Sequence, residues 1–141
     1  MAGEASLQSR DASFDAVFFR AGGLALAVDA AEVAAMVSVP DAEASGYECV
    51  NVEDALGLDS PPSRLRRALV LRPARGAVPP RTLCVVVNEP DGIGQVGVQD
   101  VRPLPAMLGG SPAARRFWAG AVREGGVVLL ASLRGLAGAG G

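Results

Sequence analysis

The stretch AGAVREGGVVLLASLRGL, residues 119–136, decides the fold class of this chain. Two apolar runs, 119–123 and 127–133, are separated by Glu124-Gly125-Gly126. Glycine adopts positive φ at no steric cost, and tight turns between antiparallel strands require that conformation. The stretch therefore predicts a β-hairpin close to the C-terminal end of the chain.

A second stretch, near the N-terminal end, has the same plan. FRAGGLALAV, residues 19–28, repeats the arginine, the Gly-Gly pair and the apolar strand that follows. Leucine and valine alternate with alanine after the turn, which is typical of a strand with one buried face. We therefore expect a first hairpin made of strands 14–20 and 24–28. Gly-Gly hairpins are common, so chance also explains the likeness of the two stretches.

Short apolar runs separated by glycine and proline fill the rest of the chain. We expect strands at residues 33–39, 47–50, 68–71, 83–87 and 96–98, loops at 40–46, 60–63 and 72–81, and a turn at 88–92. Few stretches favour a helix. We expect a helical turn capped by Asp29 and a short helix between Asn51 and Gly57. A further short helix is expected to start at Ser111-Pro112 and to end by Gly120. The pattern predicts an all-β sandwich or barrel with one or two short helices.

Length and composition indicate one domain or two small subdomains that share a core. The chain has 141 residues, of which half are apolar and a fifth are charged, enough for a packed core. Residues 1–13 are expected to form a flexible lead, residues 14–136 the domain, and residues 137–141 a flexible tail. The net charge is −2, and the chain lacks both a basic signal segment and a long apolar run. We therefore expect a cytoplasmic protein without nucleic-acid binding or membrane insertion.

The residues from which catalytic and metal sites are built are scarce. The sequence has no histidine and only two cysteines, which excludes a Ser-His-Asp triad and a structural zinc site. Cys49 and Cys84 lie in apolar strands and are expected to be buried reduced thiols, with a disulfide or a reactive thiol as the alternative. Glycines in residues 92–97 match the spacing of a dinucleotide-binding loop, but they lie between two expected strands. We expect no enzyme activity, no cofactor and no metal.

Two clusters are candidates for contacts with other proteins. Arg64, Arg66 and Arg67 form a basic group ahead of a strand. A solvated loop explains this group, and an acidic protein partner is the alternative. Phe117 and Trp118 are adjacent aromatic residues, which fit either core packing or an exposed docking anchor.

Three blocks, in order along the chain, resemble the CheW family of chemotaxis coupling proteins. VFFRAGGLALAVDAAEVAAMV, residues 17–37, is similar to the opening hairpin of that family and the valine-containing turn after it. NVEDALGL, residues 51–58, resembles its Asp-Leu-x-x-x-Leu-Gly-Leu segment. The third block has three parts. LCVVVNE (83–89) is similar to a family strand ending in Val-Asp-Glu, and VRPLP (101–105) is similar to an Ile-x-Pro-Leu-Pro segment. Residues 119–136 are similar to the terminal hairpin of the family.

The resemblance implies a fold of two small, intertwined five-stranded β-barrels that share an apolar interface. Proteins of this family link the cytoplasmic tip of a chemoreceptor to a histidine kinase within chemosensory clusters, and the receptor tip lies in an apolar groove between the barrels. Carried over to this chain, the groove positions are Val33, Val86, Val87 and Val101. Apolar side chains at strand ends suit the apolar ridge of a helix. Burial in the core is the alternative explanation for each valine.

The chain also departs from the family. Related proteins carry a strand and a loop ending in Asn-Leu-Arg-Gly before the second block, whereas only residues 40–46 separate Val39 from Tyr47 here. The resemblance therefore implies a shortened, divergent member of the FrzB type, which binds a receptor or another CheW-like protein and binds kinase weakly or not at all. The alternatives are a conventional coupling protein that bridges receptor and kinase and, from another class, a small-ligand-binding β-barrel or a small enzyme.

Overall fold

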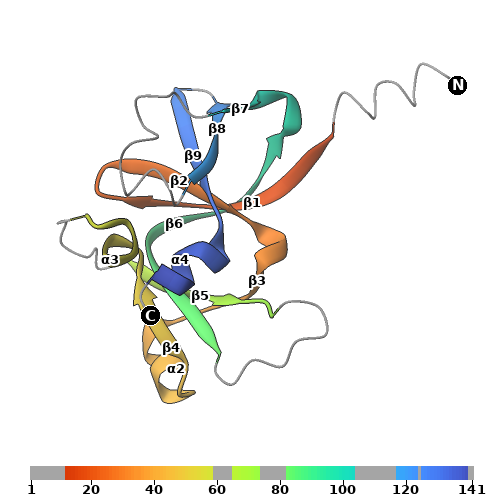
Figure 1. Ribbon diagram of the computed structural model, residues 1–141. Coiled ribbons are helices and arrows are strands. Elements are labelled where there is room, and N and C mark those ends of the chain that lie inside the picture. Colours follow the sequence, from red (N-terminus) through yellow and green to blue (C-terminus); the bar gives the residue numbers. More distant parts are fainter. Residues whose placement is uncertain (1–11, 59–64, 74–81, 104–116, 124, 140–141) are drawn as a thin grey trace, which may run out of the picture.

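The computed structural model describes residues 12–58, 65–73, 82–103, 117–123 and 125–139, and strands dominate it (Figure 1). They form one nine-stranded sheet in the order β3-β5-β6-β1-β2-β9-β8-β7, with β4 paired to β6. The expectation of an all-β fold is confirmed. The strands are β1 (Ser13–Ala21), β2 (Leu24–Asp29), β3 (Val33–Val37), β4 (Glu48–Asn51), β5 (Arg66–Leu71), β6 (Leu83–Gly97), β7 (Val101–Arg102), β8 (Phe117–Arg123) and β9 (Gly126–Ala131).

Short helices connect several of these strands. The described residues contain α2 (Val39–Ala44), α3 (Val52–Leu56), α4 (Leu133–Ala139) and the 3-10 turns η1 (Ala30–Glu32) and η2 (Val98–Asp100). This is slightly more helix than the one or two short helices expected. None of the described helices combines the length and the apolar character needed to cross a membrane.

Helix α2 replaces the polar loop expected at residues 40–46. The Ser38 hydroxyl accepts a hydrogen bond from the Asp41 backbone N–H at 3.2 Å, and Pro40 stands in the first turn. Serine as N-cap and proline in the first turn are strong start signals, because neither leaves a helical N–H unpaired. Ala42 then buries its side chain in the core. The proline thus begins a helix at this position.

Helix α3 confirms the short helix expected after Asn51. Gly57 ends it with φ of 69°, a left-handed conformation that glycine adopts without strain. The Asn51 side chain does not cap the helix as expected. It donates a hydrogen bond to Asp54 at 3.4 Å and accepts one from the Arg66 guanidinium of β5.

The two Gly-Gly hairpins lie side by side. Strand β2 pairs with β9 in parallel, with Leu26 opposite Leu129 and Val28 opposite Ala131. Because β2 and β9 each follow a Gly-Gly turn and run in the same direction, both turns lie at the same end of this strand pair. The sequence likeness of residues 19–28 to the C-terminal hairpin thus corresponds to two equivalent, neighbouring hairpins.

Strand β6 continues through residues 88–92, where a turn was expected. Asn88 is buried, and its amide donates a hydrogen bond to the buried Glu53 carboxylate of α3, so a residue typical of turns is used inside the protein. Gly92 has φ of 96°, and a bulge interrupts the β1 register between Phe18 and Arg20. The first part of β6 pairs with β4 and β5 and the later part with β1, so both halves of the molecule share this strand.

Three apolar clusters make up the described core. The central core lies between the halves and includes Phe19, Leu69, Val85, Val87, Leu133 and Leu136. The upper core lies in the half with β7, β8 and β9 and includes Ala16, Ala27, Val96 and Leu130. The lower core lies in the half with β3, β4 and β5 and includes Ala42, Ala68, Val70, Cys84 and Val86. The described strands therefore form two halves with a shared apolar interface, although β3 and β4 do not pair with each other.

Helix α4 occupies part of the tail that was expected to be flexible. Its N-terminus is held by Glu32, which accepts hydrogen bonds from the Ser132 hydroxyl at 3.1 Å and from the Leu133 backbone N–H. Leu133 and Leu136 are fully buried in the central core, and Ala137 is nearly so. The expected boundary at residue 136 is therefore corrected: residues 137–139 belong to the folded domain.

Several expected elements lie outside the described residues. They are most of the lead at 1–13, the loop at 60–63, most of the loop at 72–81 and the helix start at Ser111-Pro112. That last helix was expected to end by Gly120, and residues 117–120 are the beginning of β8.

Candidate docking surface

Two of the four expected groove valines are core residues. Val86 is 2% exposed and Val87 is fully buried. Successive side chains of a strand point to opposite faces, so Val86 packs in the lower core and Val87 in the central core. Neither valine has surface to offer a partner, and both positions are corrected from groove to core.

The other two valines are accessible but belong to different parts of the molecule. Val33 begins β3 and is half-buried against the central core. Val101, in β7, is half-buried against the upper core. Figure 1 shows β7 at the top of the upper half, whereas β3 belongs to the lower half, so the structure does not bring these two positions into one cluster.

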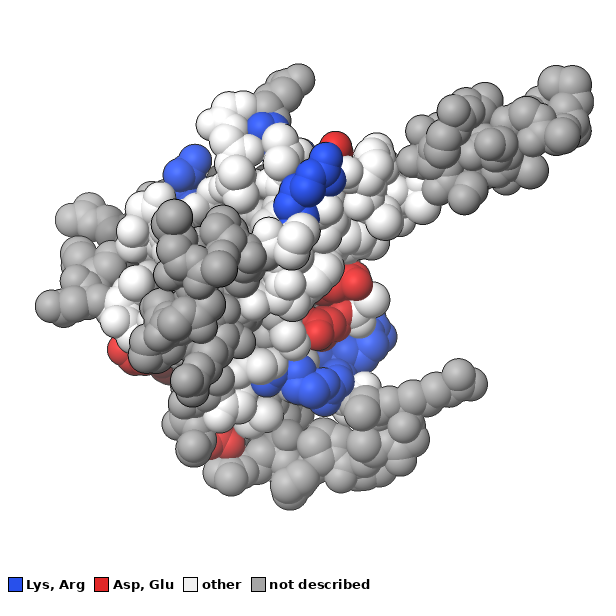
Figure 2. Space-filling view, turned by 45° about the horizontal axis from the view of Figure 1, so that its top comes forward, with Lys and Arg blue, Asp and Glu red and all other residues white. Residues whose placement is uncertain are grey.

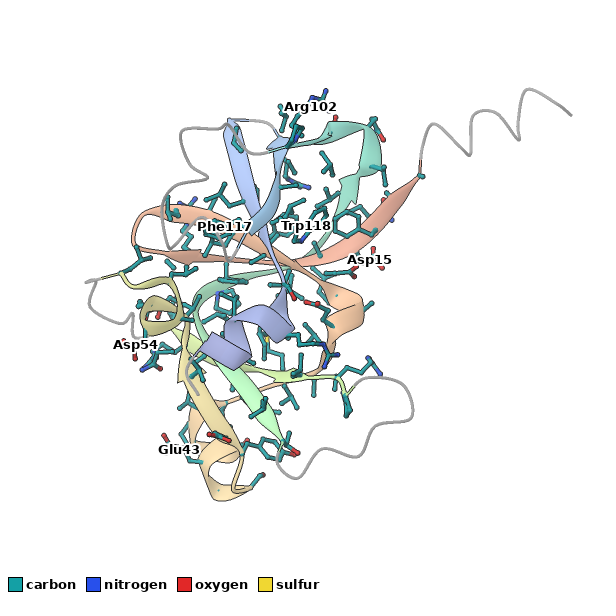
Figure 3. The ribbon with its side chains drawn as sticks, viewed as in Figure 1. Asp15, Glu43, Asp54, Arg102, Phe117 and Trp118 are labelled. Carbon is teal, nitrogen blue, oxygen red and sulfur yellow. The ribbon has the colours of Figure 1, made fainter. Side chains whose placement is uncertain are left out.

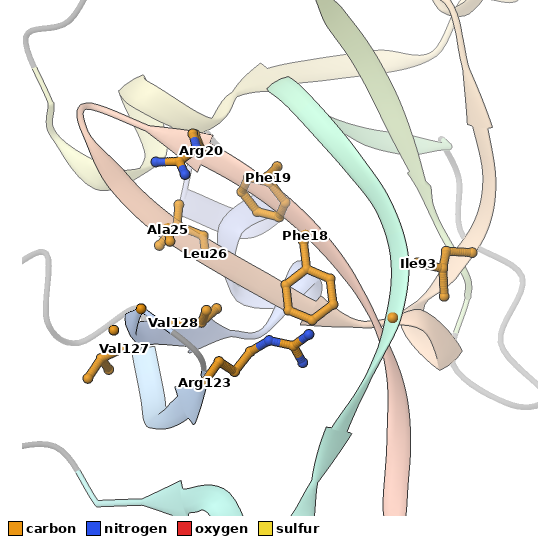
Figure 4. A pocket seen from close by; sticks show the side chains of 12 residues that line it. Phe18, Phe19, Arg20, Ala25, Leu26, Ile93, Arg123, Val127 and Val128 are labelled. Carbon is orange, nitrogen blue, oxygen red and sulfur yellow. The ribbon is translucent and has the colours of Figure 1, made fainter.

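A cavity of about 560 Å³ opens where the ends of the two hairpins meet the bend of β6, and we call it the hairpin pocket (Figure 4). Phe19 and Leu26 line it and are almost completely buried. Ile93 and Val127 also line it but are 68% and 59% exposed. The pocket therefore has a rigid apolar base and an apolar rim in contact with solvent.

Arg123 is held against one wall of the hairpin pocket. Its guanidinium carbon lies 4.4 Å from the centre of the Phe18 ring, a cation–π contact, and Nη1 donates a hydrogen bond to the Gln95 carbonyl oxygen at 2.6 Å. Gly94 makes this arrangement possible, because a Cβ at that position would lie 2.9 Å from the Phe18 ring. The glycines of residues 92–97 therefore shape a bent strand and a pocket wall.

The charged residues among the described lining of the hairpin pocket are Arg20 and Arg123. Arg20 is exposed and has no hydrogen-bond or ion-pair partner in the described part of the chain. On the face shown in Figure 2, arginine side chains lie in separate patches, and Asp or Glu side chains lie next to the lower of these patches. The hairpin pocket thus combines two positive charges with the exposed apolar side chains of Ile93 and Val127.

Phe117 and Trp118, the candidate aromatic anchor, have different environments. Phe117 is half-buried and packs against the central core. Trp118 is 53% exposed and makes a tilted contact with Phe14, with ring centroids 6.3 Å apart (Figure 3). The core explanation applies to Phe117, and Trp118 is the exposed ring of the pair.

The expected basic cluster is only partly described. The Arg66 guanidinium donates to Asn51, so it links β5 to the segment before α3. Arg67 is exposed, and Arg64 lies outside the described residues.

The two cysteines face each other without forming a disulfide. Cys49 of β4 and Cys84 of β6 are register partners in the parallel pair, and both are free thiols. Burial raises the pKa of the Cys84 thiol from 9.0 to about 12, and burial also raises the pKa of Cys49. Thiols that stay protonated are weak nucleophiles. The expected buried reduced thiol is confirmed for Cys84, whereas Cys49 is half-buried.

Sequence reasoning did not identify the hairpin pocket. Arg20 and Arg123 are 103 positions apart in the chain, and only the parallel pairing of β2 with β9 brings them to one cavity. The available signal was the likeness of the two Gly-Gly stretches, in which each arginine stands two positions before the first glycine of its pair. Among the described residues, no group of three or more potential metal ligands was found.

Comparison with known proteins gives a structural likeness. No protein-family model matches the sequence, and no curated protein matches it either. The chain is similar to the crystal structure of the scaffolding protein TtCheW from Thermoanaerobacter tengcongensis, with a TM-score of 0.67 and 12% sequence identity. The match covers 89% of this chain and 92% of that chain. The chain therefore has a CheW-like fold.

Proposed function

We propose that this chain is a non-enzymatic adaptor of a bacterial chemosensory array, located in the cytoplasm, which docks to the cytoplasmic tip of a chemoreceptor. The observation that carries the proposal is the CheW-like fold, shared with a scaffolding protein along almost the full length of both chains. The three sequence blocks that resemble coupling proteins support it, because they occur in the same order.

The chemistry of the side chains favours docking over catalysis. The sequence contains no histidine, the commonest general base. Burial keeps the Cys84 thiol protonated near neutral pH, so it is a poor nucleophile. What the described surface offers instead is apolar side chains beside arginines, a composition that suits protein interfaces.

Val33 and Val101 are the two expected groove positions that have exposed surface, and because they lie in different parts of the molecule each is tested separately for receptor docking. We expect Val33→Glu and Val101→Glu each to weaken binding of a chemoreceptor hairpin fragment about tenfold or more, because each places a charge against an apolar helix face. Isothermal titration measures the affinity, and circular dichroism checks that each variant is folded.

The matched control is Val122→Glu, which adds the same charge at a half-exposed position of β8. It is expected to bind the fragment as the wild-type chain does. If the folded Val33 and Val101 variants retain wild-type affinity, these positions are not part of the receptor site.

Kinase binding is expected to be weak or absent, as in a shortened coupling protein of the FrzB type. Residues 39–44 form helix α2 where resembling proteins carry a further strand and an arginine. A smaller lower half offers less contact area, and interfaces below about 1,200 Å² are usually weak. Titration against the regulatory domain of the array's histidine kinase measures this affinity.

A graft provides the control for the kinase experiment. A family-type strand and loop inserted between Val39 and Tyr47 is expected to strengthen kinase binding without changing receptor binding. Sub-micromolar affinity of the native chain for the kinase domain would instead identify a conventional coupling protein that bridges both partners.

A further inference from the structure

We propose that the hairpin pocket is a second docking surface, which binds an acidic segment of a partner protein that carries apolar residues beside its carboxylates. The proposal goes beyond receptor docking at Val33 and Val101, because none of the pocket residues belongs to that site. It also does not depend on the identity of the array or the receptor.

The two arginines approach the pocket from two different hairpins. Arg20 is the penultimate residue of β1, and Arg123 is the last residue of β8. Because β2 and β9 run parallel, both arginines lie near the same end of the sheet, and Figure 4 shows them on either side of the cavity. An entering segment therefore meets a guanidinium on each side.

The charges of the two arginines are available to a ligand. Arg20 has no hydrogen-bond or ion-pair partner among the described residues, and the contacts of Arg123 are to a ring and a backbone carbonyl. Neither contact neutralises the guanidinium charge. A guanidinium offers paired N–H donors that match a carboxylate, and such charge-assisted hydrogen bonds are among the strongest in proteins. Arg123 is also fixed in place, so it loses little side-chain freedom when it binds.

The exposed apolar side chains at the rim of the pocket favour apolar residues in the ligand beside its carboxylates. Ile93 and Val127 expose most of their side chains next to the arginines. Covering such apolar surface is favourable in proportion to the area removed from water. A segment that combines carboxylates with leucine, isoleucine or phenylalanine satisfies both parts of the pocket, whereas a purely acidic segment leaves the rim exposed.

The pocket suits a peptide better than a nucleic acid. Single-stranded nucleic acids bind by stacking bases on exposed aromatic faces. The Phe18 ring is covered on one side by the Arg123 guanidinium, and a Cβ on the neighbouring Gly94 would touch the same ring. Phe19, the second ring in the lining, is buried. The described rings of the pocket therefore offer little aromatic surface on which a base could stack.

The test is a selection from a random peptide library displayed on phage, with the immobilised full-length chain as target. We expect the enriched peptides to carry aspartate or glutamate next to large apolar residues. Synthetic copies, measured by fluorescence anisotropy, are expected to lose about tenfold or more in affinity against Arg20→Glu. Their affinity is also expected to fall as salt is added, since salt screens exposed charges.

Two control variants separate the pocket from general charge effects. Arg67→Glu makes the same charge change at an exposed position of β5, away from the pocket, and is expected to change affinity less than about twofold. Ile93→Ser removes exposed rim surface without touching charge and is expected to weaken binding about fivefold. All variants are checked for an unchanged circular dichroism spectrum before binding is measured.

Several outcomes would overturn the proposal. Enriched peptides without acidic residues, no enrichment at all, or equal losses with Arg20→Glu and Arg67→Glu each exclude a specific acidic ligand. Tighter binding of single-stranded DNA than of the selected peptides would make the site a nucleic-acid site. A dimer in sedimentation analysis that Arg20→Glu dissociates would show that a second copy of the chain fills the pocket.

Discussion

Val87→Glu is expected to unfold most of the protein under conditions in which the wild-type chain is folded. The Val87 side chain is fully buried in the central core, where it packs with residues of both halves and of α3 and α4. Burying a carboxylate without a partner costs several kcal/mol. Since the whole free energy of unfolding of a domain is about 5–15 kcal/mol, this one change removes much of it.

Urea unfolding followed by circular dichroism measures the effect. The control is Val122→Glu, which introduces the same side chain on β8 at 50% exposure and is expected to change the free energy of unfolding by less than about 0.5 kcal/mol. A Val87→Glu variant with a wild-type urea midpoint would contradict the position of β6 in the core. If this variant also fails to bind the receptor, the cause is unfolding, and the loss does not place Val87 in the receptor site.

Leu136→Ala is expected to lower the free energy of unfolding by about 2–5 kcal/mol, the range for large-to-small changes in a core. Leu136 is fully buried although it lies in a stretch of glycine and alanine that resembles a frayed tail. The loss arises because α4 packs on the central core and closes it. In a flexible tail, the same change would have no measurable effect.

Gly135→Ala is the matched control for that experiment. Gly135 is exposed, and a Cβ there would meet the Ser132 side chain at 3.6 Å, an ordinary contact. Alanine favours a helix over glycine by about 1 kcal/mol, so this variant is expected to be slightly more stable than wild type. Equal stabilities of both variants and wild type in urea unfolding would show that α4 does not form part of the core.

Local sequence signals were sufficient to predict the turns, strands and helix ends that depend on residues close together in the chain. The two Gly-Gly hairpins and the end of α3 at Gly57 were all expected, because a glycine with positive φ or an alternating apolar pattern acts within a few residues. The all-β class followed from the number of such signals. The apolar run around Cys84 also placed this residue in the interior correctly.

Other elements owe their conformation to contacts with residues far away in the chain, and only the tertiary structure reveals these contacts. Asn88 predicts a turn by itself, but the Glu53 carboxylate receives its amide and β6 continues. Helix α4 forms on glycine and alanine because Glu32, 100 residues before Ser132, caps it and the central core receives its leucines. The family resemblance placed Val86 and Val87 in a docking groove, with burial in the core as the alternative. Strands on both sides and cores on both faces enclose them, so the core alternative applies. The hairpin pocket exists only because β2 pairs with β9. Apart from the likeness of the two Gly-Gly stretches, nothing in the sequence predicts that Arg20 and Arg123 line one pocket.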